Sequence, residues 1–135
     1  MPALIFFGAG ASYGSGDVQP CCPPLGNGSD GLFARLEATA GLAAQLPEDL
    51  KQLFRTDFEK GMARFYEFAD GNIMRFQREM AAYLASFKPG TANEYIKLIR
   101  LIGPRRAIYA SLNYDLLFEL SAASLGWNTL FLDKV

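Results

Sequence analysis

Histidine is absent from the 135 residues, so any mechanism that needs an imidazole base must take that base from outside this chain. Cysteine is scarce, because only Cys21 and Cys22 occur and they are neighbours. Adjacent cysteines cannot cross-link distant segments, and two cysteines alone do not complete a tetrahedral zinc site. We therefore expect free thiols and no metal site.

An excess of charge of one sign is also lacking. Thirteen basic and fourteen acidic side chains give a net charge of −1, so the chain lacks the excess of positive charge that is typical of direct nucleic-acid binding. No apolar run approaches the roughly 20 residues of a membrane span, and no basic flank precedes the short apolar segment at the start. We expect no membrane segment, no signal peptide and a cytoplasmic location. Half of the residues are hydrophobic, which is typical of a globular domain, and we expect residues 1–135 to form one domain.

The chain is organised around its first twelve residues. Five apolar residues at 3–7 predict a short strand that is buried on both faces, as in a parallel sheet. Gly8 and Gly10 follow, and they let the backbone turn sharply and approach another group without a Cβ in the way. A helix that begins here would offer its first N–H groups to an anion, most often a phosphate. The alternative is a tight turn with no ligand.

The rest of the chain predicts helices and then a return to strands. Residues 13–28 are rich in Gly and Pro, which indicates a loop with at most one helical turn, and we interpret it as a lid over a bound ligand. Residues 29–104 form a helical region, and residues 105–135 predict strand, helix and strand, with strands at 107–112 and 129–132. The predicted fold class is α/β: a Rossmann-like parallel sheet of about three strands, with a helical insertion between the first two.

The helical region carries its own boundary signals. Its spacing predicts four or five helices with a mostly aromatic core stripe. The predicted helices run from a cap at Ser29 or Asp30 to about 45, from Pro47 through Phe58, through 62–69, through 76–84, and from a capping box at Thr91 and Glu94 to Gly103.

Asn113 and Asp115 stand where the second predicted strand ends. Ligands of open α/β sheets bind at the carboxyl ends of strands. If the first two strands are adjacent, the Asn113 amide and the Asp115 carboxylate face the same crevice as Gly8 and Gly10. The alternative is that Asp115 simply caps the next helix. The glycine turn is not a full dinucleotide fingerprint, because Tyr13 occupies the place of the third glycine.

The ordered set of these motifs resembles the sirtuin-like domains of bacterial anti-phage defence proteins. The resemblance spans the whole chain. It rests on the Phe-Gly-Ala-Gly-Ala-Ser run at 7–12, Pro-Leu-Gly at 24–26 with Leu32 and Phe33, and Ser-Leu-Asn-Tyr-Asp at 111–115 with Glu119.

The resemblance implies a domain that binds NAD and hydrolyses it to nicotinamide and ADP-ribose without a metal. Asn113 would match the family's catalytic asparagine and also contact NAD, and Asp115 would match the acidic residue beside it. The residues that would line the pyrophosphate and ribose are Gly8, Ala9, Gly10, Ala11 and Ser12.

The chain also departs from the family. The catalytic histidine follows the third strand in a segment that this sequence does not contain, and the four-cysteine zinc module and the arginine-bearing loop of true sirtuins are missing. We therefore expect no protein deacylation and an incomplete sirtuin-like fold. We expect it to be truncated at the C-terminus and to act within a longer protein, a partner complex or a homo-oligomer.

Two other functions fit the same residues. One is a regulatory module that binds NAD or ADP-ribose without turnover, which the absence of histidine favours. The other is a structural assembly domain in which the glycines only shape a turn. A large separation between Asn113 and the pair Gly8 and Gly10 would support the assembly domain and exclude both ligand-binding functions.

Overall fold

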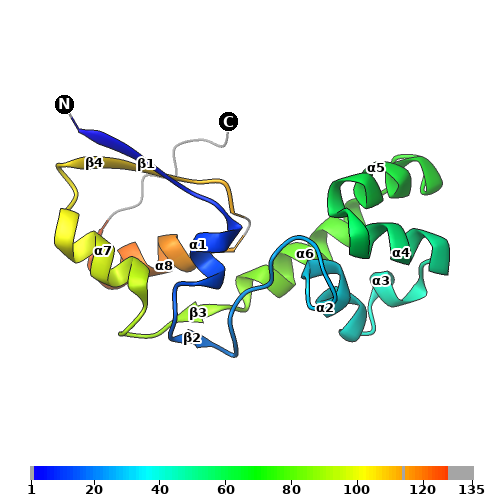
Figure 1. Cartoon of the computed structure of the whole chain (residues 1–135), viewed down its shortest axis with the longest axis horizontal. Helices are drawn as coiled ribbons and strands as arrows, with labels where there is room; N and C mark the ends of the chain where they lie inside the picture. Colours follow the sequence, from blue (N-terminus) through cyan, green and yellow to red (C-terminus); the bar gives the residue numbers. More distant parts are fainter. Residues whose placement is uncertain (1, 114, 128–135) are drawn as a thin grey trace. The chain divides into compact units, whose positions relative to one another are not determined.

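The computed structural model describes residues 2–113 and 115–127 (Figure 1). The chain divides into two compact units: unit 1 takes its described residues from 1–23 and 85–135, and unit 2 is 24–84. The helical region expected over 29–104 is therefore shared between the two units.

A parallel pair of strands forms the centre of unit 1. Strand β1 (Ala3–Phe7) pairs with β4 (Ala107–Ser111), in a register that runs from Ala3 opposite Ala107 to Phe7 opposite Ser111. These are the first two predicted strands, and they are adjacent although about 100 residues separate them in sequence. Because the strands are parallel, Gly8 and Asn113 leave the sheet at the same edge.

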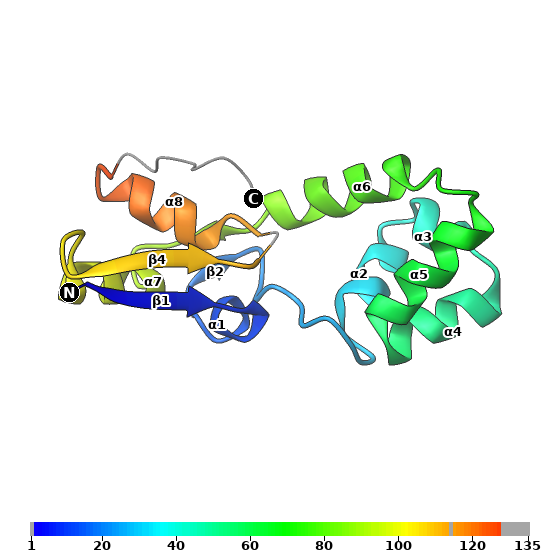
Figure 2. The same cartoon turned by 90° about the horizontal axis from the view of Figure 1, so that it is seen from above.

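Helices α7 (Glu94–Ile102) and α8 (Leu117–Ser124) pack on one face of this sheet (Figures 1 and 2). The Phe7 ring is the centre of that contact: its centroid lies 5.0 Å from that of Tyr95 on α7 and 5.0 Å from that of Phe118 on α8. Edge-to-face and tilted ring pairs of this kind add to the free energy gained by burial.

The other face of the sheet is exposed among the described residues. Leu4 and Phe6 on β1 are 58% and 61% exposed, and Ile108 on β4 is 57% exposed. The prediction of a first strand buried on both faces was therefore wrong for the described part of the chain. An apolar run of five residues cannot by itself show whether one or two layers of helix cover a strand.

A second, two-stranded sheet was not predicted. After the short helix α1 (Ala9–Tyr13), strand β2 (Val18–Gln19) pairs antiparallel with β3 (Lys88–Pro89). The Gly90 amide also donates to the Asp17 carbonyl over 2.7 Å. Residues 17–19 are thus held against residues 88–90, and the interpretation of the segment 13–28 as a lid over a ligand stays a prediction.

The fold of the described residues is mixed α/β, with four strands in two separate two-stranded sheets. The third strand predicted at 129–132 lies outside the described residues. A Rossmann-like sheet therefore remains a prediction.

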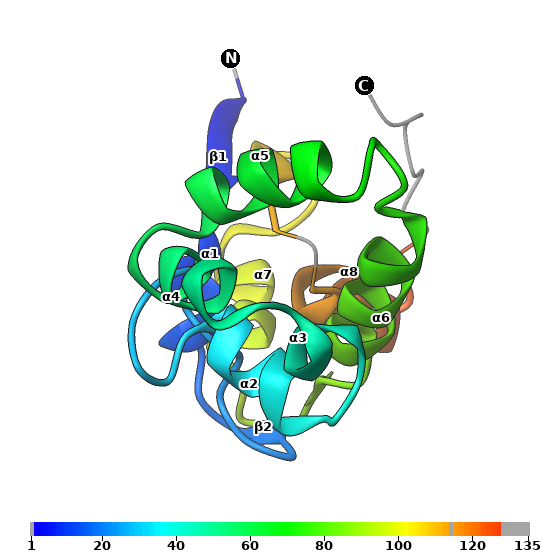
Figure 3. The same ribbon diagram turned by 90° about the vertical axis from the view of Figure 1, so that its right-hand side faces the viewer.

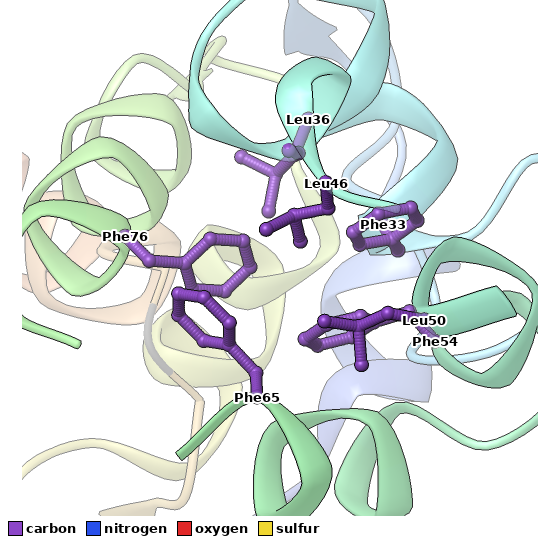
Figure 4. Close-up of a cluster of buried hydrophobic side chains, with 8 residues drawn as sticks. Phe33, Leu36, Leu46, Leu50, Phe54, Phe65 and Phe76 are labelled. Carbon is purple, nitrogen blue, oxygen red and sulfur yellow. The ribbon is translucent and has the colours of Figure 1, made fainter. Parts of the chain in front are cut away.

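Unit 2 is helical (Figure 3), and its core is a group of buried side chains that we call the phenylalanine cluster (Figure 4). The members of this cluster are Phe33, Leu36, Ala43, Leu46, Leu50, Phe54, Phe65 and Phe76. The ring of Phe54 is fully buried and stacks on Phe33, with centroids 4.5 Å apart. The helices are α2 (Leu32–Ala38), α3 (Leu42–Gln45), α4 (Glu48–Thr56), α5 (Phe58–Phe68) and α6 (Met74–Ala85). No helix in the described ranges is long and apolar enough to cross a membrane.

The helix predicted from Ser29 or Asp30 to about 45 is in fact two helices, and α2 begins after Gly31 rather than after a side-chain cap. The chain turns at Ala40, where φ is +59°. The α3 helix then begins with the Leu42 amide donating to Glu79 Oε2 over 2.8 Å. Glu79 is 37 residues away, so the sequence near the turn carried no sign of this cap.

The capping box predicted at Thr91 and Glu94 was also wrong. The N-cap of α7 is Asn93, whose side chain accepts a hydrogen bond from the Tyr95 amide over 2.9 Å. Asn93 is fully buried, and its Nδ2 also donates to Ser15 Oγ and to the Gly16 carbonyl. Because those partners lie far away in the sequence, the residues around 91–94 did not reveal that Asn93, and not Thr91, is the N-cap of α7.

Candidate functional site

The site is built on the turn that follows β1, entirely within unit 1. Gly8 leaves the strand with extended backbone and is the N-cap of α1. A Cβ added at Gly8 or at Gly10 would meet no other atom within 4 Å. The backbone of this turn is therefore open to a group from outside the chain. Ala9 and Ala11 are exposed on the same short helix, whereas Ser12 is buried.

Asn113 ties the end of β4 to this turn. Its Nδ2 donates to the Gly8 carbonyl over 3.0 Å and to Ser12 Oγ over 3.0 Å. The opposite orientation of the amide would set Oδ1 against the Gly8 carbonyl, which can only accept, so the network determines the orientation. Both hydrogens of Nδ2 are engaged, and Oδ1 is left as the atom with which Asn113 can accept a hydrogen bond.

Asp115 lies beside Asn113 and is only 6% exposed. Its Oδ1 accepts from Ser12 Oγ over 3.0 Å and from the Leu117 amide over 3.1 Å. The second bond engages the first N–H group of α8, although the N-cap residue of this helix is Leu116 and not Asp115 as the capping alternative expected. The first bond connects the same carboxylate to the glycine turn.

Tyr95 completes this group, and sequence reasoning assigned it only to the apolar stripe of a helix. Its hydroxyl lies 2.8 Å from Ser12 Oγ. Burial is the main cause that raises the pKa of Tyr95 above its usual value, and the negative charges of Asp115 and Glu119 raise it further. The phenol therefore keeps its proton at neutral pH. No local signal predicted this contact, because Ser12 and Tyr95 are 83 residues apart.

Glu119 contributes a second carboxyl group near Asp115. Burial raises the pKa of Glu119, and the charge of Asp115 raises it further. Its Oε2 is buried and has no hydrogen-bond partner among the described residues. Glu119 therefore holds its proton to a higher pH than an exposed glutamate does.

A second hydrogen-bonded layer supports the turn from behind. Ser15 Oγ donates to the Ser12 carbonyl over 2.9 Å and accepts from Asn93 Nδ2 over 2.9 Å. Ser15 is as deeply buried as Ser12, but these side-chain bonds do not involve Asn113 or Asp115. The layer connects α1 to the start of α7.

The structure thus brings Gly8, Ser12, Asn113 and Asp115 together. Gly8 is in hydrogen-bond contact with Asn113, so the separation that would have supported a pure assembly domain is not found for Gly8. In the described part of the chain, no three acidic or cysteine side chains gather in a way that could hold a metal ion.

Comparison of the chain with family models, with curated proteins and with solved structures gives no match.

Proposed function

We propose that unit 1 binds NAD at the edge where β1 and β4 end, and that the protein hydrolyses NAD to nicotinamide and ADP-ribose with the help of a base outside these 135 residues. The observation that carries the proposal is the Asn113 amide. It is anchored to the Gly8 carbonyl at 3.0 Å and keeps Oδ1 as a hydrogen-bond acceptor beside an open glycine turn. A role in anti-phage defence is what the family resemblance implies.

The chemistry of NAD suits these groups. The open backbone at Gly8 and Gly10 allows close approach of a pyrophosphate, which a side chain would obstruct. Asn113 Oδ1 can accept a hydrogen bond from a ribose hydroxyl or from water. The carboxylate of Asp115 lies close enough to share Ser12 with Asn113, and its negative charge would favour positive charge that develops on the ribose.

The hydrolysis breaks the bond between ribose C1′ and the nicotinamide nitrogen. Nicotinamide leaves as a neutral molecule with the bonding electron pair, and the ribose passes through an oxocarbenium-like state. The oxygen of water then bonds to C1′, and the proton of that water passes to a base. The chain has no histidine, so we assign this step to a base outside these residues.

Calorimetric titration of NAD, with nicotinamide release followed in parallel, tests the proposal. We expect NAD to bind without release by this chain, and Asn113→Ala to weaken binding about tenfold, the effect of one well-placed hydrogen bond. The absence of binding in a folded sample would overturn the proposal. Release of nicotinamide by this chain alone would overturn the assignment of the base to another segment.

A regulatory module that binds NAD or ADP-ribose without turnover is the second candidate, and the absence of histidine favours it. Titration of ADP-ribose discriminates between the two. Binding of ADP-ribose as tight as that of NAD would favour the regulatory module, because such a site does not need to recognise the leaving group.

A further inference from the structure

The hydroxyl group of Ser12 is the junction of the candidate site. It lies within hydrogen-bond distance of Asn113 Nδ2 at 3.0 Å, Asp115 Oδ1 at 3.0 Å and the Tyr95 hydroxyl at 2.8 Å. These three partners come from α7 and from the segment after β4, and they converge on a side chain that is 1% exposed.

A count of hydrogens determines the direction of each bond. A serine hydroxyl has one hydrogen to donate and can accept two. Asp115 is acceptor-only when ionised, so Ser12 donates its hydrogen to Asp115 Oδ1. The Asn113 amide can only donate through Nδ2, so Ser12 accepts there. The remaining position accepts from Tyr95, whose phenol therefore donates.

This count leaves the Ser12 hydroxyl with no capacity for a ligand. We propose that Ser12 is a positioning residue that couples Asn113 to Asp115 and does not itself contact the ligand, and that the Tyr95 hydroxyl occupies its last acceptor position. The role concerns the site assigned above and so rests on the proposed function. It differs from the ligand-lining role that the family resemblance implies for Ser12.

If Ser12 has this positioning role, three substitutions should differ in how strongly they disturb the site. Ser12→Ala removes one hydrogen-bond partner from each of Asn113, Asp115 and Tyr95, and it removes the link between the amide and the carboxylate. Tyr95→Phe keeps the ring beside Phe7 and leaves the Ser12 bonds to Asn113 and Asp115 in place, so its effect is smaller. Ser15→Ala is the matched control, because it also removes a buried hydroxyl with two hydrogen bonds from the same turn.

The first test uses the protein without ligand. Nuclear magnetic resonance of the Asn113 side-chain amide reports whether its hydrogens are held. We expect Ser12→Ala to shift this resonance pair and to speed exchange of one hydrogen by about tenfold or more, whereas Ser15→Ala leaves both close to the wild type. A residue that only contacts a ligand would leave the amide unchanged, and that result overturns the proposal.

The second test adds NAD. We expect the affinity to fall about tenfold in Ser12→Ala and about twofold in Tyr95→Phe and Ser15→Ala. If Ser12→Ala does not fold, Ser12→Cys carries the same tests, because it keeps the shape with only a weak donor. Equal losses in Ser12→Ala and Ser15→Ala would overturn the proposal. Failure of NAD to bind the wild type, with the amide result as expected, would overturn the proposed function and leave the coupling by Ser12 standing.

Discussion

The carboxyl group of Glu119 is buried next to a second carboxylate, and its Oε2 has no hydrogen-bond partner among the described residues. Both features disfavour the charged form in the folded protein. The pKa of Glu119 in the folded state is therefore raised above the value of about 4.5 that it has when exposed. The folded state binds more protons than the unfolded state between these two pKa values, so the stability of unit 1 falls as the pH rises through that window.

Glu119→Gln removes this cost while keeping the shape of the side chain. We expect the variant to be more stable than the wild type at pH 7 by about 1 kcal/mol, with the difference vanishing below the pKa of the unfolded state. Urea denaturation at several pH values measures it. A variant that is less stable at pH 7, or that keeps the pH dependence of the wild type, would contradict this expectation. Such a result would show that the Glu119 carboxylate is charged in the folded protein and has hydrogen-bond partners.

Gly61 in helix α5 lies directly against the ring of Phe54. A Cβ at this position would come within 2.5 Å of Phe54 Cδ1. Gly→Ala inside a helix ordinarily stabilises by up to ~1 kcal/mol, but here we expect Gly61→Ala to destabilise unit 2 by about 2 kcal/mol through overpacking. The control is Ala63→Gly on the exposed side of the same helix, where the ordinary preference for alanine holds. Stabilisation by Gly61→Ala would mean that the Phe54 ring can move aside.

At the scale of elements, β1 has two unlike faces. Phe7 is 6% exposed and packs between Tyr95 and Phe118, whereas its neighbour Phe6 is 61% exposed. We expect Phe7→Thr to cost about 3–4 kcal/mol of unfolding free energy and Phe6→Thr less than about 1 kcal/mol. Threonine suits a strand in both positions, so the comparison isolates burial. Chemical denaturation measures both values. Equal losses of unfolding free energy in the two variants would show that a further layer covers the outer face of β1.

The sequence predicted well those elements that local signals determine. Gly103 ends α7 with φ near +78°, and Pro47 directly precedes α4, as expected. The sequence did not predict the elements whose structure depends on distant residues. Glu79 caps the start of α3, and β2 forms because residues 88–89 pair with it. In the site, Asn113 and Asp115 stood out by their position after a strand, whereas Tyr95 did not because its role depends on a contact with Ser12.

At the scale of the whole molecule, the described chain has two separate centres of packing. The phenylalanine cluster lies entirely within unit 2, and the hydrogen bonds around Ser12 lie entirely within unit 1. We expect Phe54→Ala to destabilise unit 2 by about 3–5 kcal/mol and to leave the Asn113 amide resonances at their wild-type positions. Thermal unfolding followed residue by residue measures both. Loss of the Asn113 signals together with those of unit 2 would show that the units unfold as one.

We propose that NAD binds where β1 and β4 end. The most direct test is titration of NAD into the isotope-labelled chain, with the backbone amides of Gly8 and Gly10 and the side-chain amide of Asn113 followed together. We predict saturable shifts at these three positions and none in unit 2, and smaller shifts of Gly8 and Gly10 in Asn113→Ala at the same NAD concentration. Saturable shifts confined to unit 2, or no shift at any NAD concentration in a folded sample, would show that NAD does not bind at this edge of the sheet.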